Sequence, residues 1–160
     1  MSRPLTPGEA ALARSVFAAA IDYRRVRIAD RRWGRFAVVF GHRITFPPSS
    51  PAPSDFALRP LRERAWLVHE LTHVWQFQTA PWRTLASWAA TALSGGYGPG
   101  LPGYRYEAAL KPWAAYNLEQ QARIVEHAYL LREAGACPAA PPGATLAALA
   151  ACTPFPSLQA

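Results

Sequence analysis

Cysteine is scarce in this chain of 160 residues, which has Cys137 and Cys152 and no others. One pair cannot build the disulfide framework that holds many small secreted domains together. Fourteen residues separate the two, which is not the spacing of a zinc knuckle. The pair could form a bridge that pins the C-terminal segment, or stay reduced. The fold therefore depends on a hydrophobic core, and the chain is long enough for one.

Long hydrophobic runs are also absent. The longest apolar stretch after the middle of the chain, LASWAATAL at 85–93, is far shorter than the roughly 20 residues that span a bilayer. The N-terminal residues MSRPLTPGEAALARSVF contain no apolar run of the kind found in signal peptides. We therefore expect a soluble, cytoplasmic protein that is made without a cleaved leader and does not insert into membranes.

Lysine is almost missing, with one residue against sixteen arginines. The net charge of +7 is carried by residues 1–64, where twelve arginines face five acidic residues, whereas residues 65–160 are balanced. This is typical of GC-rich coding sequence, and alternatively indicates a basic surface for an acidic partner or nucleic acid. The densest basic ribbon consists of Arg25, Arg27, Arg31, Arg32 and Arg35. No nucleic-acid-binding motif accompanies it, so nucleic acid is not an expected partner.

The order of periodic segments predicts an α+β fold. Sixteen prolines and ten glycines limit most elements to short lengths. The alternating pattern of residues 23–46 indicates a small antiparallel sheet of two to four strands. One domain is expected over residues 1–135, followed by a Pro/Ala-rich extension at 136–160 that packs on it or is partly flexible. The expected helices cover residues 7–20, 60–78, 82–93, 112–134 and 144–151, with a Gly-rich loop at 94–103.

The sequence LVHELTHVWQ at 67–76 contains a candidate metal site. His69 and His73 are four residues apart, so on a helix their imidazoles lie one turn apart on nearly the same side and can bind one ion. Glu70 lies about 100° around the axis from His69, where it can reach a water molecule bound to that ion. Two histidines of a packed helix with no metal role are the alternative.

A zinc site of this type needs a third protein ligand and one open position. The segment NLEQQARIVEHAY at 117–129 offers Glu119 and Glu126, which are seven residues apart and share one edge of an apolar helix face. We predict Glu119 as the ligand. Glu126 is the second choice, or else orients a histidine. Glu107 is a weaker third candidate.

HELTHVWQ followed by EQQA resembles the gluzincin branch of the HExxH zinc metallopeptidases, or zincins. More narrowly, HELTHVWQ and NLEQQARIVE resemble small bacterial proteins described as Vgr-related or Rhs-associated. The resemblance implies a zincin-like fold, in which the sheet packs on an active-site helix and a glutamate-bearing helix. It also implies zinc bound by His69, His73 and Glu119, with Glu70 as the general base. Arg123 departs from the pattern, because gluzincins often have an acidic residue there.

The implied function is a zinc-dependent hydrolase, specifically a metallopeptidase that acts on a peptide or protein. The alternative is a catalytically silent zincin-fold protein that binds or assists a bacterial secretion or effector system, with export by a specialised system. Hydrolysis also needs a donor for the developing oxyanion. Tyr104 and Tyr106 are the candidates, because they lie in the segment that leads back to Glu119.

Overall fold

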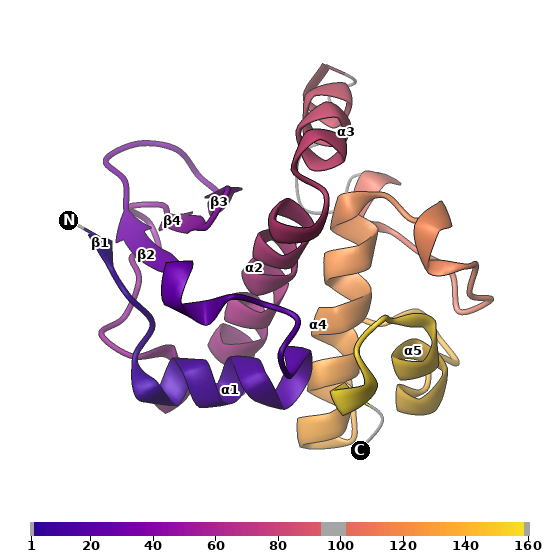
Figure 1. Ribbon diagram of the computed structural model, residues 1–160. Helices are drawn as coiled ribbons and strands as arrows, with labels where there is room; N and C mark the ends of the chain where they lie inside the picture. The colour runs from indigo at the N-terminus through magenta and orange to yellow at the C-terminus, as the bar shows by residue number, and fades with distance from the viewer. Residues whose placement is uncertain (1, 94–101, 159–160) are drawn as a thin grey trace.

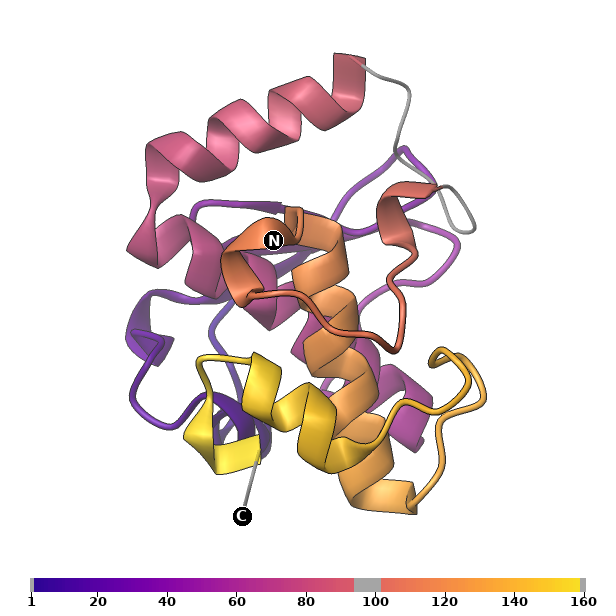
Figure 2. The same cartoon turned by 90° about the vertical axis from the view of Figure 1, so that its right-hand side faces the viewer.

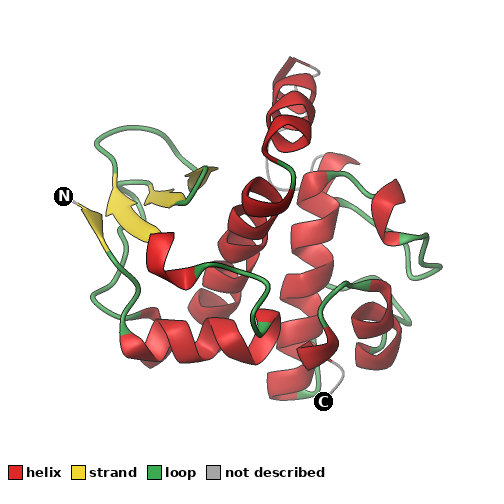
Figure 3. Ribbon diagram, viewed as in Figure 1, coloured by secondary structure: helices red, strands yellow, loops and turns green. Residues whose placement is uncertain are grey.

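The computed structural model describes residues 2–93 and 102–158, and these residues form an α+β domain (Figures 1 and 3). Most of the predicted loop at 94–103 lies outside the described residues. None of the described helices is both long and apolar enough to cross a membrane. The strands are β1 (Ser2–Arg3), β2 (Arg27–Asp30), β3 (Val38–Phe40) and β4 (Arg43–Phe46). The α-helices are α1 (Pro7–Phe17), α2 (Leu61–Thr79), α3 (Pro81–Leu93), α4 (Leu118–Ala134) and α5 (Leu146–Cys152).

Helix α1 begins where the sequence predicts. The Thr6 hydroxyl accepts a hydrogen bond from the Glu9 amide at 3.0 Å, and the Glu9 carboxylate accepts one from the Thr6 amide at 2.9 Å. This capping box satisfies two amides that the first turn would otherwise leave unpaired. The helix ends at Phe17, earlier than predicted, because Ala18 adopts a positive φ of 46° and turns the chain.

The small sheet is mixed, so the prediction of an antiparallel sheet was wrong. The strand order is β1-β2-β4-β3, and β2 pairs with β4 in parallel while the other two pairs are antiparallel. The turn at Gly41, which has a φ of 60°, makes β3 and β4 a hairpin. Buried Ile44 pairs beside buried Ile28, which brings β4 rather than β3 against β2. Since β4 runs opposite to β3, it lies parallel to β2.

Helices α2 and α4 lie side by side at the centre of the molecule, with the sheet beyond α2 and α5 beyond α4 (Figures 1 and 2). Helix α2 ends before Pro81, which begins α3 and has no amide hydrogen to continue the ladder. Helix α4 begins at Leu118, later than predicted, because Asn117 caps it through a capping box with Gln120. It ends at Gly135 in the left-handed conformation.

The C-terminal segment packs on α4 and adds Leu149, Phe155 and Leu158 to the same buried core. Phe155 stacks edge-on against Phe17 of α1 with ring centroids 4.9 Å apart. The core thus joins the first and last helices. Cys137 and Cys152 are both free thiols.

Candidate metal centre

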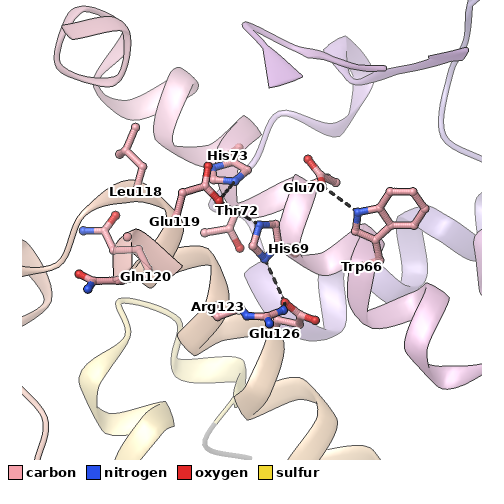
Figure 4. A network of polar contacts seen from close by, with 12 residues as sticks. Trp66, His69, Glu70, Thr72, His73, Leu118, Glu119, Gln120, Arg123 and Glu126 are labelled. Carbon is pink, nitrogen blue, oxygen red and sulfur yellow. Dashed lines mark hydrogen bonds and ion pairs between the residues drawn. The ribbon is translucent and has the colours of Figure 1, made fainter. Parts of the chain in front are cut away.

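Three side chains of α2 and α4 converge between the two helices. His69 and His73 stand one turn apart on α2, and Glu119 lies in the first turn of α4 (Figure 4). The Nε2 atoms of both histidines lie 3.5 Å from the same oxygen, Oε2 of Glu119. Their side chains are only 10–13% exposed. One ligand atom from each residue lies within 4.8 Å of the others, so the three could hold a metal ion.

The Nδ1 atoms of both histidines are held by other side chains. Nδ1 of His69 lies 3.0 Å from Oε2 of Glu126, and Nδ1 of His73 lies 2.8 Å from Oε1 of Gln76. A carboxylate and an amide oxygen can only accept, so each imidazole carries its proton on Nδ1 when neutral. Each Nε2 then presents a lone pair toward Glu119, which is the tautomer that a metal ligand requires.

Gln76 is itself fixed across the helix interface. Its amide nitrogen donates to the carbonyl of Leu118 at 3.1 Å and to Oε1 of Gln121 at 2.9 Å. These bonds establish which end of the amide is the oxygen and aim that oxygen at His73. Gln76 therefore joins the orientation of His73 to the start of α4, next to Glu119.

The buried histidines and carboxylates of this group shift one another's pKa values. Burial disfavours charge on His69, but hydrogen bonds with Glu119 and Glu126 raise its pKa to about 10. The pKa of His73 is also raised, because the charge of Glu119 outweighs burial. Burial acts against charge on Glu119 as well, yet His73 and His69 hold its pKa well below its usual range. The site thus favours a positive charge at the place where the imidazole nitrogens face the carboxylates.

Glu70 lies beside this group but does not belong to it. Its carboxylate accepts a hydrogen bond from Nε1 of Trp66 at 2.9 Å, and Figure 4 shows it turned toward that indole. The residue is buried, and burial raises the pKa of Glu70 against the opposing effect of His69 and His73. A carboxylate with a raised pKa is better suited to accept and return a proton near neutral pH.

Glu126 and Arg123 supply the outer layer of the site. Nη1 of Arg123 donates to Oε2 of Glu126 at 3.1 Å, the oxygen that also contacts His69. Burial disfavours charge on Glu126, but His69 and Arg123 lower its pKa. The carboxylate that orients His69 thus comes from the position seven residues after Glu119, and Arg123 holds it in place.

The two tyrosine candidates lie in different surroundings. Tyr106 is buried, and its hydroxyl lies 2.7 Å from Nδ1 of His127. Tyr104 is half-buried and lines the cleft described below, whereas Tyr106 does not. Glu107 is exposed and lies outside the group of three. The predictions missed Trp66 and Gln76. Helical spacing signals both contacts, because Trp66 precedes Glu70 by four residues and Gln76 follows His73 by three.

A cleft of about 1270 Å³ opens onto His69, His73 and Glu119, which are called the metal group below. Its floor is α2 and α4, and its walls are the loop at 31–37 with β3, the proline-rich loop at 47–53, and α3. The lining residues from the site are His69, Glu70, His73, Glu119, Arg123 and Glu126. The group is therefore accessible to a ligand although its side chains are largely buried.

Two histidines and a glutamate on adjacent helices define a candidate metal centre at the base of a cleft. No protein-family model matches the chain. Its sequence is similar to the type VI secretion system spike protein VgrG2b of Pseudomonas aeruginosa, with 34% identity over 140 residues. That match covers 80% of this chain but 13% of the spike protein, so the chain spans a small part of that relative's length.

The solved structure of the effector domain of Pseudomonas aeruginosa VgrG2b is similar to this one. The TM-score is 0.70 at 28% sequence identity, and the match covers 93% of this chain and 80% of that domain. Both comparisons relate the chain to VgrG2b, and the structural comparison relates it to the effector domain of that protein. The Vgr-related part of the resemblance is thereby confirmed.

Proposed function

We propose that this protein is a zinc-dependent hydrolase that cleaves peptide bonds. One observation carries the proposal: both Nδ1 atoms are held by acceptors, and both Nε2 atoms are 3.5 Å from one oxygen of Glu119. Two neutral imidazoles and one carboxylate are the ligands of a catalytic zinc site with one open coordination position. The chemistry of these donors fits zinc, and a zincin-like fold belongs to the same proposal.

When bound, zinc supplies a Lewis acid that polarises a carbonyl and acidifies water. The chain's own residues do the rest of the work. Glu70 takes up at its carboxylate a proton from the attacking water and passes it to the leaving amine, and the Trp66 indole orients that carboxylate. Glu126 and Gln76 hold the imidazoles in the required tautomer. Burial keeps these groups largely away from bulk water, which strengthens their interactions.

The position of β3 supports a peptide as substrate. This strand is an edge of the sheet, and Val38 and Val39 line the cleft. An extended peptide can add to such an edge through backbone hydrogen bonds, which places its carbonyls along the cleft. Tyr104 lines the same cleft and is the tyrosine we propose as a donor to the oxyanion, in preference to Tyr106.

The similarity to the VgrG2b effector domain supports a role as an exported effector. We propose that the chain works with a type VI secretion system, and that its spike proteins are the partners. A protein or peptide in the recipient compartment would then be the substrate, and the cytoplasm would be only the place of synthesis.

The test is metal content together with cleavage of a peptide library. We expect one zinc per chain, lost from His69→Ala and His73→Ala, and cleavage that a chelator abolishes. Glu70→Gln should keep the zinc and lose cleavage. The matched control is Glu107→Gln, since Glu107 is an exposed glutamate outside the group. Purified protein that holds no zinc, and whose stability is unchanged by a chelator, would refute the proposal.

A second candidate function is a catalytically silent binding protein with the same site. Both comparisons name VgrG2b, as a type VI secretion spike protein and as its effector domain, and these names specify a secretion role but no reaction, which supports this alternative better than an enzyme. The same experiment separates the two. Zinc bound tightly by the wild-type chain with no cleavage of any library peptide would identify the silent protein.

A further inference from the structure

The cleft has two chemically different ends, and α2 runs between them. Arg62 precedes His69 by seven residues, which places it on nearly the same side of the helix about 10 Å along the axis. Phe77 follows His73 by four residues, about 6 Å in the other direction. Both residues line the cleft. The metal group therefore lies between a basic end and an aromatic end.

Arginines dominate the end near the start of α2. The charged residues that line the cleft here are Arg31, Arg35, Arg59, Arg62 and Glu63. Arg59 is paired with Glu63 at 2.9 Å, whereas neither Arg35 nor Arg62 makes an ion pair among the residues that the structure describes. Both side chains are exposed. Two uncompensated guanidinium groups are thus available to bind carboxylates.

The loop at 31–37 belongs to the same end. Phe46, at the end of β4, packs edge-on against Trp66 with ring centroids 4.8 Å apart, and the amide of Arg31 donates a hydrogen bond to the carbonyl of Phe46. These contacts place Arg31 near the first half of α2. Figure 1 shows the loop arching above the sheet from the end of β2 to the start of β3.

Aromatic side chains line the other end, beyond His73. Phe77 is nearly buried and packs against Phe40 with centroids 5.8 Å apart. Trp88 of α3 is 47% exposed and lines the cleft, as does Thr84. Among the described residues, those of α2 and α3 beyond His73 that line the cleft carry no charge. This end is suited to a large apolar side chain.

We infer that the cleft selects peptides with an acidic side chain on one side of the scissile bond and a large apolar side chain on the other. The inference rests on the proposed function and names its substrate class. An extended peptide advances about 3.3 Å per residue, so the distance to Arg62 places the acidic residue about three positions from the bond. The distance to Phe77 places the apolar residue about two positions away.

The experiment compares cleavage of fluorogenic peptides by the zinc-loaded chain. The peptides carry Glu or Lys about three positions from the bond on one side, and Phe or Ser about two positions away on the other, in both chain directions. In one of the two directions we expect kcat/KM for the Glu–Phe peptide to exceed that for the Lys–Phe peptide by at least tenfold. Raising the salt concentration should reduce this ratio, because both arginines are exposed.

Charge reversal tests the assignment to particular residues. The variant Arg35→Glu with Arg62→Glu should abolish or invert the preference for Glu over Lys. The matched control is Arg32→Glu with Arg83→Glu, which makes the same change in net charge at two exposed arginines outside the cleft lining. Equal kcat/KM for Glu and Lys peptides in the wild-type chain, or equal loss of preference in both double variants, would overturn the inference.

A binding measurement separates this inference from the proposed function. Glu70→Gln is titrated with the same peptides, labelled for fluorescence anisotropy. If the wild-type chain cleaves no peptide, but Glu–Phe peptides bind tightly and this binding depends on Arg35 and Arg62, hydrolysis is refuted and the ligand class stands. If peptides are cleaved without any effect of their charge, hydrolysis stands and the ligand class is refuted.

Discussion

Two buried glutamates, Glu9 and Glu119, differ in the hydrogen-bond donors that surround their carboxylates. Glu9 is fully buried, and its two oxygens accept four hydrogen bonds. The two guanidinium nitrogens of Arg3 donate at 2.7 Å, and the backbone amides of Thr6 and Phe56 donate at 2.9 and 3.0 Å. Every donor is permanent, because amides and arginine keep their protons at any physiological pH.

Within the described part of the chain, Glu119 has no comparable set of donors. Its Oε2 faces two histidine nitrogens at 3.5 Å, at the outer limit of hydrogen bonding, and either nitrogen donates only when its ring is protonated. An anion with exchangeable protons around it can trade them for a metal ion, whereas one with fixed donors cannot. Glu9 is thus a carboxylate that stabilises the fold, whereas Glu119 is one that is available to bind a metal ion.

The largest expected effect is that substitution of Glu9 lowers stability with little change in zinc affinity, whereas substitution of Glu119 lowers zinc affinity. Glu9→Ala should lower the free energy of unfolding by about 3 kcal/mol, since it removes the acceptor of two backbone amides and the ion-pair partner of Arg3. Zinc affinity of the folded chain should stay within about twofold. Glu119→Ala should reduce zinc affinity by more than the roughly 10–100-fold that loss of an outer partner costs. Urea denaturation and calorimetric zinc titration measure the two quantities.

Two further variants serve as reference points for Glu9→Ala and Glu119→Ala. The zinc affinity of Glu126→Gln should lie between those of the two variants, with a loss of about 10–100-fold, because this change keeps the ligands but weakens the orientation of His69. Glu63→Gln, at an exposed pair with Arg59, should change neither quantity measurably. If Glu9→Ala weakened zinc binding as much as Glu119→Ala, the division between anchor and binding site would be wrong.

The next effect is a pH dependence that zinc reverses. The folded pKa of His69 is raised from 6.5 to about 10, so its contribution to stability is fully present below about pH 6.5 and is lost as pH rises toward 10. Zinc binding displaces these protons, so the stabilisation by zinc should grow over the same range. Thermal melts between pH 6.5 and 9, with and without zinc, should show opposite trends. A zinc-induced shift in Tm that shrinks with rising pH would contradict this.

The smallest effect concerns Tyr106. Tyr106→Phe removes the hydrogen bond to His127 and should cost about 1 kcal/mol of unfolding free energy, with kcat nearly unchanged. Burial lowers the pKa of His127 from 6.5 to about 4. The unfolded chain therefore binds a proton at this histidine more readily than the folded chain, and the folded state loses stability as pH falls from 6.5 toward 4. Tyr104→Phe is the paired variant, and we expect it to lower kcat without a loss of stability. A large fall in kcat for Tyr106→Phe would reverse our choice between the tyrosines.

Local sequence signals predicted the parts of the fold that depend on neighbours along the chain. The capping box at Thr6 predicted the start of α1, and helical spacing placed His69 and His73 one turn apart on α2. Glu119 was predicted from the edge of a later apolar helix face, and it lies close to both histidines. The start of α4 was predicted too early because Pro112 was taken as its first turn, whereas it precedes a short 3₁₀ helix and Asn117 provides the cap.

Contacts between distant segments were not predictable in the same way. Strands β2 and β4 are four residues long, and a short alternating pattern does not specify which strand becomes the neighbour or in which direction it runs. The same holds for Gln76, whose amide reaches across to Leu118 and Gln121. Glu126, which the sequence offered either as a ligand or as the residue that orients a histidine, lies 3.0 Å from Nδ1 of His69, and Arg123 donates a hydrogen bond to it.

The placement of the metal group on two helices has a consequence for how the chain resists unfolding. Glu119 follows His73 by 46 residues, so an ion bound by both would close that stretch as a reversible cross-link, much as a disulfide does. Unlike a disulfide, this cross-link would strengthen with the concentration of free zinc, by about 4.1 kcal/mol at 1,000 times the dissociation constant. The same polypeptide would then unfold readily where zinc is scarce and become durable where zinc is plentiful.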